Sequence, residues 1–280
     1  MKEVSTLLIK EQIKKMFIEM NYELGSDVVS CLNETRGKEE SLIGKEVLNN
    51  LLDNLDIAKE KQIPICQDTG MAVVFLQIGQ GVTLTDLYIE EAVNQGVREA
   101  YQEGFLRKSV VKDPLERVNT NDNTPAVIHY EIIPGDQVKI FAMAKGFGSE
   151  NMGRVKMLNP SDGKEGIVKF VVDTVCGAGA NPCPPVIVGV GVGGTMEKAT
   201  ILSKKALLRP LGQPNSNSEY SKIEKEMLRR MNALGIGPQG FGGRCTAMAV
   251  HIEYYPTHIA GLPVAVNINC HVARHRESVI

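Results

Sequence analysis

Hydrophobic residues in the first sixty positions recur at the spacing of an α-helix. One apolar face runs from Ile9 to Met20, and a second runs from Ile43 to Leu55. Between them, Ser26 can cap a shorter helix that carries Cys31. The pattern therefore predicts a helical N-terminal portion with one buried face per helix.

Strand patterns begin after this helical portion. The run "MAVVFLQI" at 71–78 predicts a buried strand, and Thr85 is expected to cap a helix ending near Gly104. The segment "AVIHYEIIPGDQVKIFAMAKG" predicts a β-hairpin that turns at Pro134–Asp136. Between helix and hairpin lies a polar loop at 106–125. Loops of this length are more often functional than accidental.

The second half of the chain alternates helices and strands. A helix is expected at about 164–176, followed by loop, buried strand, glycine turn and helix over 177–209. A polar linker and one more helix lead to a strand at 245–255, and a turn with His258 returns into "LPVAVNINC". No sequence repeat is apparent. The predicted fold is mixed α/β, with N-terminal helices packed on a mixed sheet.

Length and charge narrow the class of protein. A chain of 280 residues, 43% hydrophobic, predicts one large domain or two closely packed lobes. A net charge of -2 gives no field that would attract nucleic acid or an anionic membrane. The N-terminus has no signal or transit pattern, and no apolar run approaches the roughly 20 residues of a membrane span. We therefore expect a cytoplasmic protein with reduced cysteines.

The six cysteines fall into two groups. Three lie in apolar helix or strand patterns and are expected to be small buried hydrophobes: Cys31, Cys176 and Cys245. The other three lie in loops or at the end of an element. Cys66 follows Pro64 in "IPICQDTG", Cys183 stands between two prolines in "NPCPP", and Cys270 ends a strand. A thiolate at such a position can point into a cleft.

Three dispersed cysteines leave several metal hypotheses open. A structural zinc site usually has four ligands in close pairs, and the chain has no C-x-x-C pair. An electron-transfer iron–sulfur cluster also takes four protein ligands. A cubane held by three thiolates would leave one iron open, as a Lewis acid for a hydroxyl and a carboxylate of a substrate.

A dinucleotide-binding protein is the alternative from another class. Gly189, Gly191 and Gly194 match G-x-G-x-x-G between a strand and a helix. However, no second parallel strand ending in an acidic residue is predicted after that helix. The glycine turn would otherwise bring the chain close to a cluster, or place helix N–H groups near an anion.

Several long segments carry a family resemblance. They are "ICQDTG", "DPLERVNTNDNTPAVIH", "KGFGSENM", "NPCPPVIVGVGVGGT" and "THIAGLPVAVNINCHVARH". Together they resemble the α-chain of the class I, iron–sulfur-dependent fumarate hydratase and L-tartrate dehydratase family, from about residue 10 to the C-terminus. The resemblance implies a hydro-lyase with a [4Fe-4S] cluster bound by Cys66, Cys183 and Cys270, whose loops would converge on one cleft.

The resemblance also implies a set of substrate contacts: Gln67, Asp68, Arg107, a glycine amide taken as Gly148, and His258. Arg107 would hold a carboxylate through two parallel hydrogen bonds. Gln67 and Asp68 would orient the hydroxyl or the cluster surroundings, and His258 would donate to a carboxylate. Asp68 and His258 are the candidate catalytic residues.

Finally, the resemblance implies a partner. In that family a second, β portion supplies the general base and further cations, and this chain ends at Ile280 soon after Cys270. We therefore expect residues 1–280 to form the α domain without the β portion, as the α subunit of an α2β2 heterotetramer. The expected reaction is the reversible hydration of fumarate to L-malate, with L-tartrate dehydration as the alternative.

Overall fold

The structure is a computed structural model that describes residues 2–280. The chain forms two compact units. Unit 1 comprises the described part of Met1–Gly25, together with Asn54–Phe147 and Arg274–Ile280, and unit 2 comprises Ser26–Asp53 and Gly148–Ala273. Each unit contains a four-stranded sheet with both parallel and antiparallel pairs, which confirms the predicted mixed α/β class.

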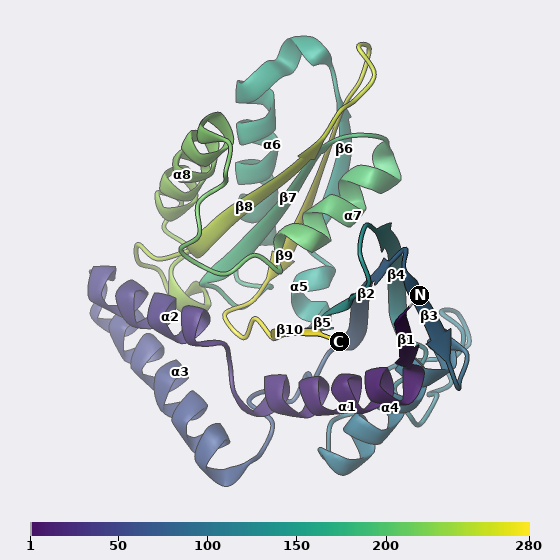
Figure 1. Ribbon diagram of the computed structural model, residues 1–280. Coiled ribbons are helices and arrows are strands. Elements are labelled where there is room, and N and C mark those ends of the chain that lie inside the picture. Colours follow the sequence, from purple (N-terminus) through teal and green to yellow (C-terminus); the bar gives the residue numbers. More distant parts are fainter. Residues whose placement is uncertain (1) are drawn as a thin grey trace. The chain divides into compact units, whose positions relative to one another are not determined.

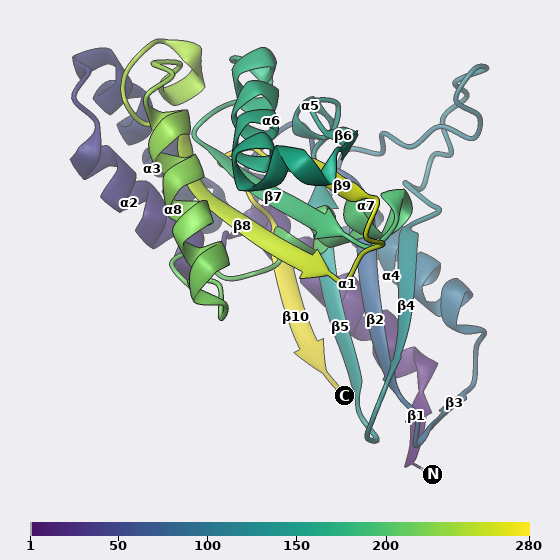
Figure 2. The same ribbon diagram turned by 90° about the horizontal axis from the view of Figure 1, so that it is seen from above.

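The sheet of unit 1 has the strand order β10-β5-β2-β4 (Figure 2). Its central strand β2 (Met71–Gly79) pairs in parallel with β4 (Val127–Ile133) and antiparallel with β5 (Val138–Lys145). Strand β10 (His275–Val279), which the sequence did not predict, pairs antiparallel with β5. The predicted strand at 71–78 is therefore confirmed as the centre of a sheet.

Two helices cover this sheet. Helix α1 (Thr6–Tyr22) begins after Ser5, whose hydroxyl accepts a hydrogen bond from the Leu7 amide. Helix α4 (Ile89–Glu103) packs beside it. The α1 side chains in the core are those predicted from the spacing: Ile9, Ile13, Met16, Phe17 and Met20. The helical periodicity therefore identified the buried face correctly.

The expected cap at Thr85 is wrong. Thr85 ends strand β3 (Val82–Thr85), which pairs in parallel with β1 (Lys2–Ser5). Helix α4 begins four residues later, after Tyr88, which makes no side-chain capping hydrogen bond. Thr85 is extended because it pairs with β1, a strand from the start of the chain that the local pattern does not reveal.

The predicted hairpin at Pro134–Asp136 is also wrong, although both of its strands exist. Strands β4 and β5 do not pair with each other, because β2 lies between them. Most of β2 is buried, so it requires a neighbour on each side. The 134–136 turn instead crosses the end of β2, and its Gly135 carbonyl accepts a hydrogen bond of 2.8 Å from the Gly81 amide.

The sheet of unit 2 has the order β6-β9-β7-β8. The fully buried strand β7 (Val186–Gly193) pairs in parallel with β8 (Ala247–Tyr255) and antiparallel with β9 (Leu262–Asn269). Strand β6 (Arg154–Leu158) forms the outer antiparallel strand. Strands β8 and β9 are joined by the turn that contains His258, but β7 separates them.

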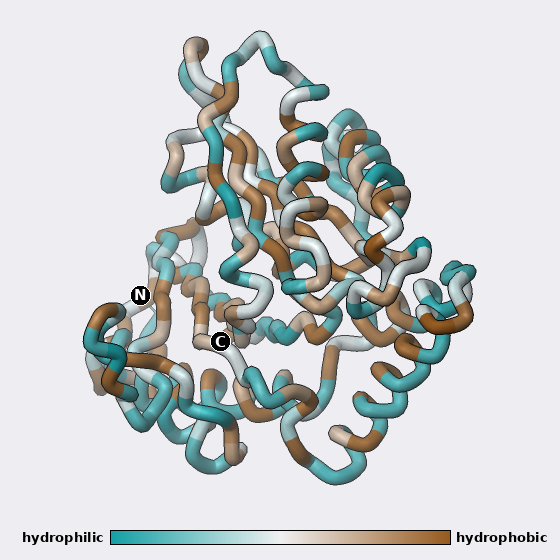
Figure 3. Tube along the Cα trace, turned by 180° about the vertical axis from the view of Figure 1, so that it is seen from behind, coloured by the Kyte–Doolittle hydropathy of each residue, from teal (hydrophilic) through white to brown (hydrophobic). Residues whose placement is uncertain are grey.

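Helices cover both faces of this second sheet. Helices α6 (Gly163–Ala178) and α8 (Ser218–Asn232) pack on the valines of β7, and α7 (Met196–Ala206) packs on the opposite face (Figure 1). Hydrophobic residues run along the sheet strands, whereas the covering helices alternate between hydrophobic and polar residues (Figure 3). The three helices predicted in this half of the chain are therefore confirmed.

The remaining helical elements are peripheral or short. Helix α2 (Ser26–Lys38) belongs to unit 2, and α3 (Leu42–Lys61) begins in unit 2 and continues into unit 1 at Asn54. The predicted apolar face of α3 is buried only in part, since Leu48 and Leu55 are buried but Ile43 is exposed. Short turns are α5 (Phe147–Glu150), η1 (Pro160–Asp162) and η2 (Pro238–Gly240).

The glycine motif has a packing role rather than a nucleotide-binding one. Gly189 and Gly191 lie inside the buried strand β7. A Cβ atom at Gly191 would lie 1.9 Å from the Ala199 carbonyl oxygen of α7, and one at Gly189 would lie 2.1 Å from that of Ser203. These glycines let α7 approach the strand closely, which removes the basis for the dinucleotide hypothesis. The turn at Gly193 follows β7 whereas Cys183 precedes it, so the eight-residue strand separates the glycine turn from this predicted ligand.

A repeat is present in the topology although none is visible in the sequence. In each unit a central strand leads through helical structure to a parallel neighbour, and the next strand returns antiparallel on the other side of the central strand. Each sheet ends in a further antiparallel strand, β10 in unit 1 and β6 in unit 2. None of the helices formed by residues 2–280 has the length and hydrophobicity needed to span a membrane.

Candidate functional site

Most of the predicted site residues lie at one end of each sheet. In unit 1, Cys66 precedes the start of β2, which pairs with the end of β5 through Met71 and Lys145. In unit 2, Cys183 precedes the start of β7, which pairs with the end of β9 through Ile187 and Asn269. The repeated topology therefore brings the start of a central strand beside the end of its antiparallel neighbour in both units.

In unit 2 this arrangement brings the Cys183 and Cys270 loops together. The ring Nδ1 of His271 lies 3.1 Å from the Cys183 carbonyl oxygen. The Gln239 side-chain nitrogen lies 3.1 Å from the same Nδ1 and donates to the Pro184 carbonyl over 2.8 Å. With a proton on Nδ1, His271 donates to the Cys183 carbonyl. Without that proton, Nδ1 accepts from Gln239, which also donates to the Pro184 carbonyl, so either tautomer links the two loops.

Gly148 lies beside the same loops. A Cβ atom at Gly148 would lie 3.6 Å from the Asn181 carbonyl oxygen, two residues before Cys183. Glu150 anchors this turn, since it accepts from Lys204 over 2.5 Å and from the Asn267 amide over 3.1 Å. Unit 2 therefore places Gly148 beside the Cys183 loop, which His271 links to the Cys270 loop.

His258 is not brought to this end of unit 2. It is exposed in the turn between β8 and β9, where its Nδ1 accepts from the Ala260 amide over 3.2 Å. The length of β9, about 26 Å for an eight-residue strand, separates this turn from Cys270. His258 instead lines a separate cavity of about 530 Å³ with Lys164 and Tyr220.

In unit 1 the turn that carries Cys66 is held by hydrogen bonds on several sides. The Asp68 carboxylate accepts from the Gly70 and Phe147 amides, each over 2.9 Å. The Arg274 guanidinium, which is 2% exposed, donates to the Asp68 carbonyl over 2.6 Å and to Asn21 over 2.9 Å. These contacts orient the Asp68 carboxylate and fix the turn.

Gln67 and Arg107 complete the predicted set in unit 1. The Cys66 thiol lies 3.4 Å from the side-chain oxygen of Gln67. Arg107 is exposed in the long loop, and its carbonyl oxygen accepts from the Thr69 hydroxyl over 2.9 Å. Unit 1 therefore brings Gln67, Asp68 and the backbone of Arg107 to the Cys66 turn.

A comparison with known families shows to which family the chain belongs. Residues 10–279 match the family described as Fumarate hydratase (Fumerase). The chain belongs to the fumarate hydratase family. The match spans both units, and it contains every predicted ligand and substrate contact.

Individual relatives agree with the family match. The chain is 43% identical over 268 residues to a protein of Methanocaldococcus jannaschii that is provisionally named L(+)-tartrate dehydratase subunit alpha, covering 94% of each chain. It is 37% identical over 248 residues to the L(+)-tartrate dehydratase subunit alpha of Escherichia coli strain K12, covering 87% of this chain and 81% of that one. The same similarity holds for the protein of that name from Shigella sonnei. The family resemblance stated from the sequence is therefore confirmed.

This member of the fumarate hydratase family has three further cysteines. Two of them have a raised pKa, and the third is exposed on helix α6. Burial, followed by the nearby Glu39 carboxylate, raises the pKa of Cys245 to about 12, and burial also raises the pKa of Cys31. Both disfavour the thiolate that a metal requires. Cys245 is buried as predicted and Cys31 is half-buried, but Cys176 is exposed because it faces outward near the end of α6.

The predicted ligands suit an iron–sulfur cluster in their chemistry. Among residues 2–280, no three Cys, His, Asp or Glu side chains are grouped closely enough to hold a single metal ion. Cys66 belongs to unit 1, whereas Cys183 and Cys270 belong to unit 2. Each lies in a loop at the site end of its sheet, and soft thiolates are the donors that iron–sulfur clusters take.

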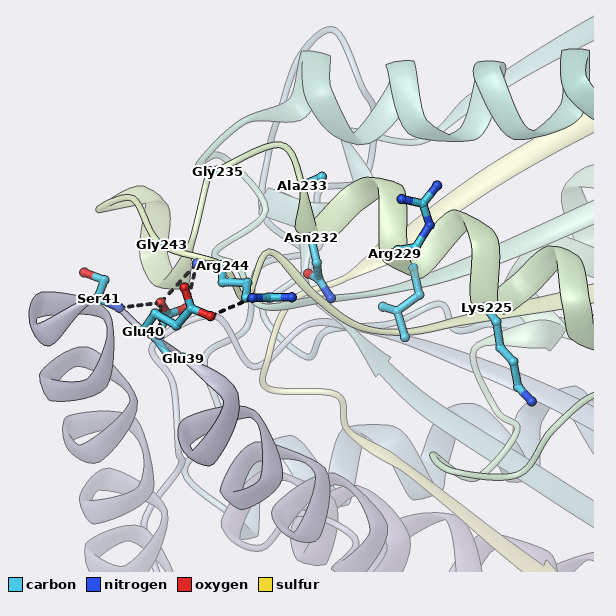
Figure 4. A pocket seen from close by; sticks show the side chains of 11 residues that line it. Glu39, Glu40, Ser41, Lys225, Arg229, Asn232, Ala233, Gly235, Gly243 and Arg244 are labelled. Atoms are coloured by element: carbon cyan, nitrogen blue, oxygen red, sulfur yellow. Dashed lines mark hydrogen bonds and ion pairs between the residues drawn. The ribbon is translucent and has the colours of Figure 1, made fainter.

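Unit 2 also contains a cavity of about 780 Å³ (Figure 4). Its wall contains the buried Glu39, whose carboxylate accepts from the backbone amides of Glu40, Ser41, Arg244 and Cys245. The lining residues include no predicted site residue. The bonds of Glu39 tie the α2–α3 turn to the loop before β8 and serve the fold.

The sequence analysis missed the residues that hold the predicted contacts. They are Tyr101, Asn123, Gln239, His271 and Arg274. Asn123 lies in the loop already considered functional for its length, and Arg274 lies in the last of the quoted motifs. However, a polar residue in a loop is more often exposed than buried, so only the structure shows that Asn123 and Arg274 are inside.

Proposed function

We propose that this chain is the α subunit of a two-chain hydro-lyase that interconverts fumarate and L-malate. A [4Fe-4S] cluster held by Cys66, Cys183 and Cys270 is part of the proposal. The observation that carries it is the position of these cysteines and of Asp68 and Gly148 at the equivalent end of two sheets, in a chain that belongs to the fumarate hydratase family.

Two contacts of the Cys66 turn are close in sequence to other residues of the proposal. Phe147, whose amide donates to Asp68, is followed directly by Gly148 beside the Cys183 loop. Arg274, which binds the Asp68 carbonyl, follows Cys270 by only four residues, a span of at most about 14 Å. The proposal therefore needs only short connections along the chain between the contacts of the Cys66 turn and the segments that carry Gly148 and Cys270.

Each residue then has a chemical task. The cluster, when bound, would supply an open iron as a Lewis acid that makes hydroxide a tolerable leaving group. Arg107 would bind one carboxylate through two N–H groups, and the Gly148 amide would donate to the substrate. Asp68, oriented by the Gly70 and Phe147 amides, and Gln67 would accept or donate at the substrate hydroxyl.

We propose that His258 takes part in a site completed by another subunit. The length of β9 separates it from Cys270 in its own chain, and a four-carbon dicarboxylate is far shorter. In the proposed α2β2 assembly, an exposed His258 would reach the substrate of a neighbouring copy. His258 would then remain a substrate contact, but for the substrate bound to a different chain from its own.

A β partner is proposed because none of the predicted contacts among the described residues is assigned the role of general base at carbon. Removal of a proton from the carbon next to a carboxylate needs a base within hydrogen-bond reach, and the distal carboxylate needs further cations. The relatives from M. jannaschii and E. coli are named as alpha subunits, which supports a second chain. We propose that the site closes where α and β meet.

L-tartrate is the second candidate substrate. The relatives at 43% and 37% identity carry the name of an L(+)-tartrate dehydratase subunit. Tartrate differs from malate by one hydroxyl, so the same carboxylate contacts would serve both. The choice depends on whether a polar group meets the second hydroxyl, because a buried polar group left unpaired disfavours the smaller substrate.

The test is anaerobic reconstitution of the chain with iron and sulfide, with and without the β subunit. We expect a brown protein with broad absorption near about 400 nm. Activity should appear only with the β subunit, be highest with L-malate and fumarate, and decay in air. A faster rate with L-tartrate would select the second candidate, and full turnover by the chain alone would contradict the two-chain proposal.

A further inference from the structure

Three buried side chains of unit 1 join the Cys66 turn to the base of the Arg107 loop. We call Thr69, Tyr101 and Asn123 the clamp. Their exposed fractions are 1%, 1% and 0%. The clamp matters because its two ends are segments that carry proposed site residues.

Asn123 makes the central connection. Its side-chain oxygen accepts from the Ser109 amide over 2.7 Å and from the Val110 amide over 3.2 Å. Its side-chain nitrogen donates to the Gly70 carbonyl over 3.2 Å. One amide group therefore links the chain just after Arg107 to the chain just after Asp68. Its backbone has φ +63°, a conformation that asparagine tolerates better than most residues.

Tyr101 and Thr69 strengthen the same connection. The Tyr101 hydroxyl, from the buried face of α4, lies 2.7 Å from the Thr69 carbonyl and 2.8 Å from the Gly70 carbonyl, and donates to them. Burial raises the pKa of Tyr101 far above its usual range, so it remains a donor. The Thr69 hydroxyl donates to the Arg107 carbonyl over 2.9 Å. The Arg107 backbone is thus held next to the Cys66 turn.

The rest of the loop has contacts of its own. A bridge between Val111 and Asn119 closes the loop on itself, and Asn119 donates to the Lys108 carbonyl over 2.9 Å. Leu115 near the tip is 89% exposed. The loop is therefore internally ordered, and the clamp acts only at its base.

From these contacts we infer that the clamp is a positioning device that sets the distance between the Arg107 guanidinium and the Cys66 thiolate. A dicarboxylate bound at one end by Arg107 would then present its hydroxyl-bearing carbon at the correct distance from the cluster. The clamp residues are positioning residues, because they act through Arg107 and Cys66. The inference rests on the proposed function.

The experiment compares two matched substitutions in the complete two-chain enzyme. Asn123→Gly removes the clamp amide and permits the positive φ, whereas Asn119→Gly removes an amide that binds only within the loop. We expect KM for L-malate to rise about 10- to 100-fold in Asn123→Gly, with unchanged iron content. Asn119→Gly should leave KM close to that of the wild type.

Two substitutions at Thr69 test the same inference in case Asn123→Gly does not fold. Thr69→Val removes the hydroxyl that binds Arg107 while preserving shape, and it should raise KM about tenfold. Thr69→Ser restores a hydroxyl and should restore KM. Loss of activity in all four variants through lower kcat at unchanged KM would show a general structural role and overturn the inference.

Hydrogen exchange supplies a readout that does not depend on activity. The Ser109 and Val110 amides should exchange faster in Asn123→Gly and at the wild-type rate in Asn119→Gly. If they exchange faster while an active enzyme keeps its KM, the inference alone is wrong. If the wild-type enzyme holds iron–sulfur but is inactive with fumarate, L-malate and L-tartrate, the proposed function fails, and the clamp's role in substrate placement fails with it.

Discussion

The two units share the order of three of their strands, β5-β2-β4 in unit 1 and β9-β7-β8 in unit 2, but helices cover their sheets differently. In unit 1, α1 and α4 pack on a central strand with bulky residues such as Val74 and Leu76. In unit 2, helices cover both faces, and one face of the central strand carries glycines that admit the backbone of α7. The difference teaches that the shared topology, and not a shared core, determines where the site end of each sheet lies.

The site ends also differ in how they are held. The Cys66 turn of unit 1 is fixed by buried side chains, among them Arg274 and Asn123. The Cys183 and Cys270 loops of unit 2 are joined through His271 and Gln239 at the rim of the sheet. Unit 1 thus carries one predicted thiolate ligand together with the predicted substrate contacts Gln67, Asp68 and Arg107, and unit 2 carries two predicted thiolate ligands and Gly148. Experiments can test each part of this comparison.

The largest expected effect concerns the thiols that the two units provide. Serine at Cys66, Cys183 or Cys270 should abolish cluster retention after reconstitution and lower activity by at least about 100-fold, because each removes one soft ligand. Iron analysis and absorbance would measure the loss. The matched control is Cys176→Ser, which changes an exposed thiol. Loss of iron in this control, with retention of iron in Cys66→Ser, would refute the assignment of one ligand to unit 1 and two to unit 2.

The next effect tests the glycine face that distinguishes unit 2. Gly191→Ala should destabilise the protein by about 3 kcal/mol, because the new Cβ would lie 1.9 Å from the Ala199 carbonyl and 2.7 Å from the Ser203 amide. Urea unfolding followed by circular dichroism would measure it. Gly177→Ala is the control, since no atom lies within 4 Å of a Cβ there. Equal stability of the two variants would contradict the close packing of α7.

A smaller effect concerns the hydrogen bonds of Glu39 in unit 2. Burial opposes ionisation of Glu39, but its hydrogen bonds from the Arg244, Ser41, Cys245 and Glu40 amides outweigh burial and lower its pKa below 4.5. Glu39→Gln should cost about 2 kcal/mol near neutral pH. Because the folded pKa is the lower one, this advantage of Glu39 is present above about pH 4.5 and is lost as pH falls through the folded pKa.

Denaturant unfolding of wild type and Glu39→Gln across this acid range would check the sign. The two stability curves should converge as the pH falls. A difference that stays constant down to about pH 3 would show that the carboxylate charge contributes nothing, and that Glu39 acts by shape alone.

The smallest effects are expected on the outer surfaces of the covering helices. The pairs Lys169–Asp173 on α6 and Lys15–Glu19 on α1 have side chains between 49% and 71% exposed. Lys169→Ala and Lys15→Ala should each change the unfolding free energy by less than about 0.5 kcal/mol, because water screens exposed pairs. If only one of the two variants changed the unfolding free energy by more than about 1 kcal/mol, the ion pair on that helix would contribute more to stability than an exposed pair should.

The local pattern determined which segments form helices and strands and which cysteines could serve as ligands. Helical spacing identified the buried face of α1, and runs of apolar residues identified β2 and β7. Loop position and family resemblance selected Cys66, Cys183 and Cys270. These properties depend on neighbouring residues along the chain, so they are visible in the sequence.

Only the tertiary structure decided which strands become neighbours and which polar residues are buried. It placed β2 between β4 and β5, added β10 from the far end of the chain, and moved His258 away from Cys270. It also turned Asn123 and Arg274 inward to hold the Cys66 turn. Strand pairing and polar burial depend on partners distant in sequence, and a periodicity of two or 3.6 residues specifies a face but not the partner that covers it.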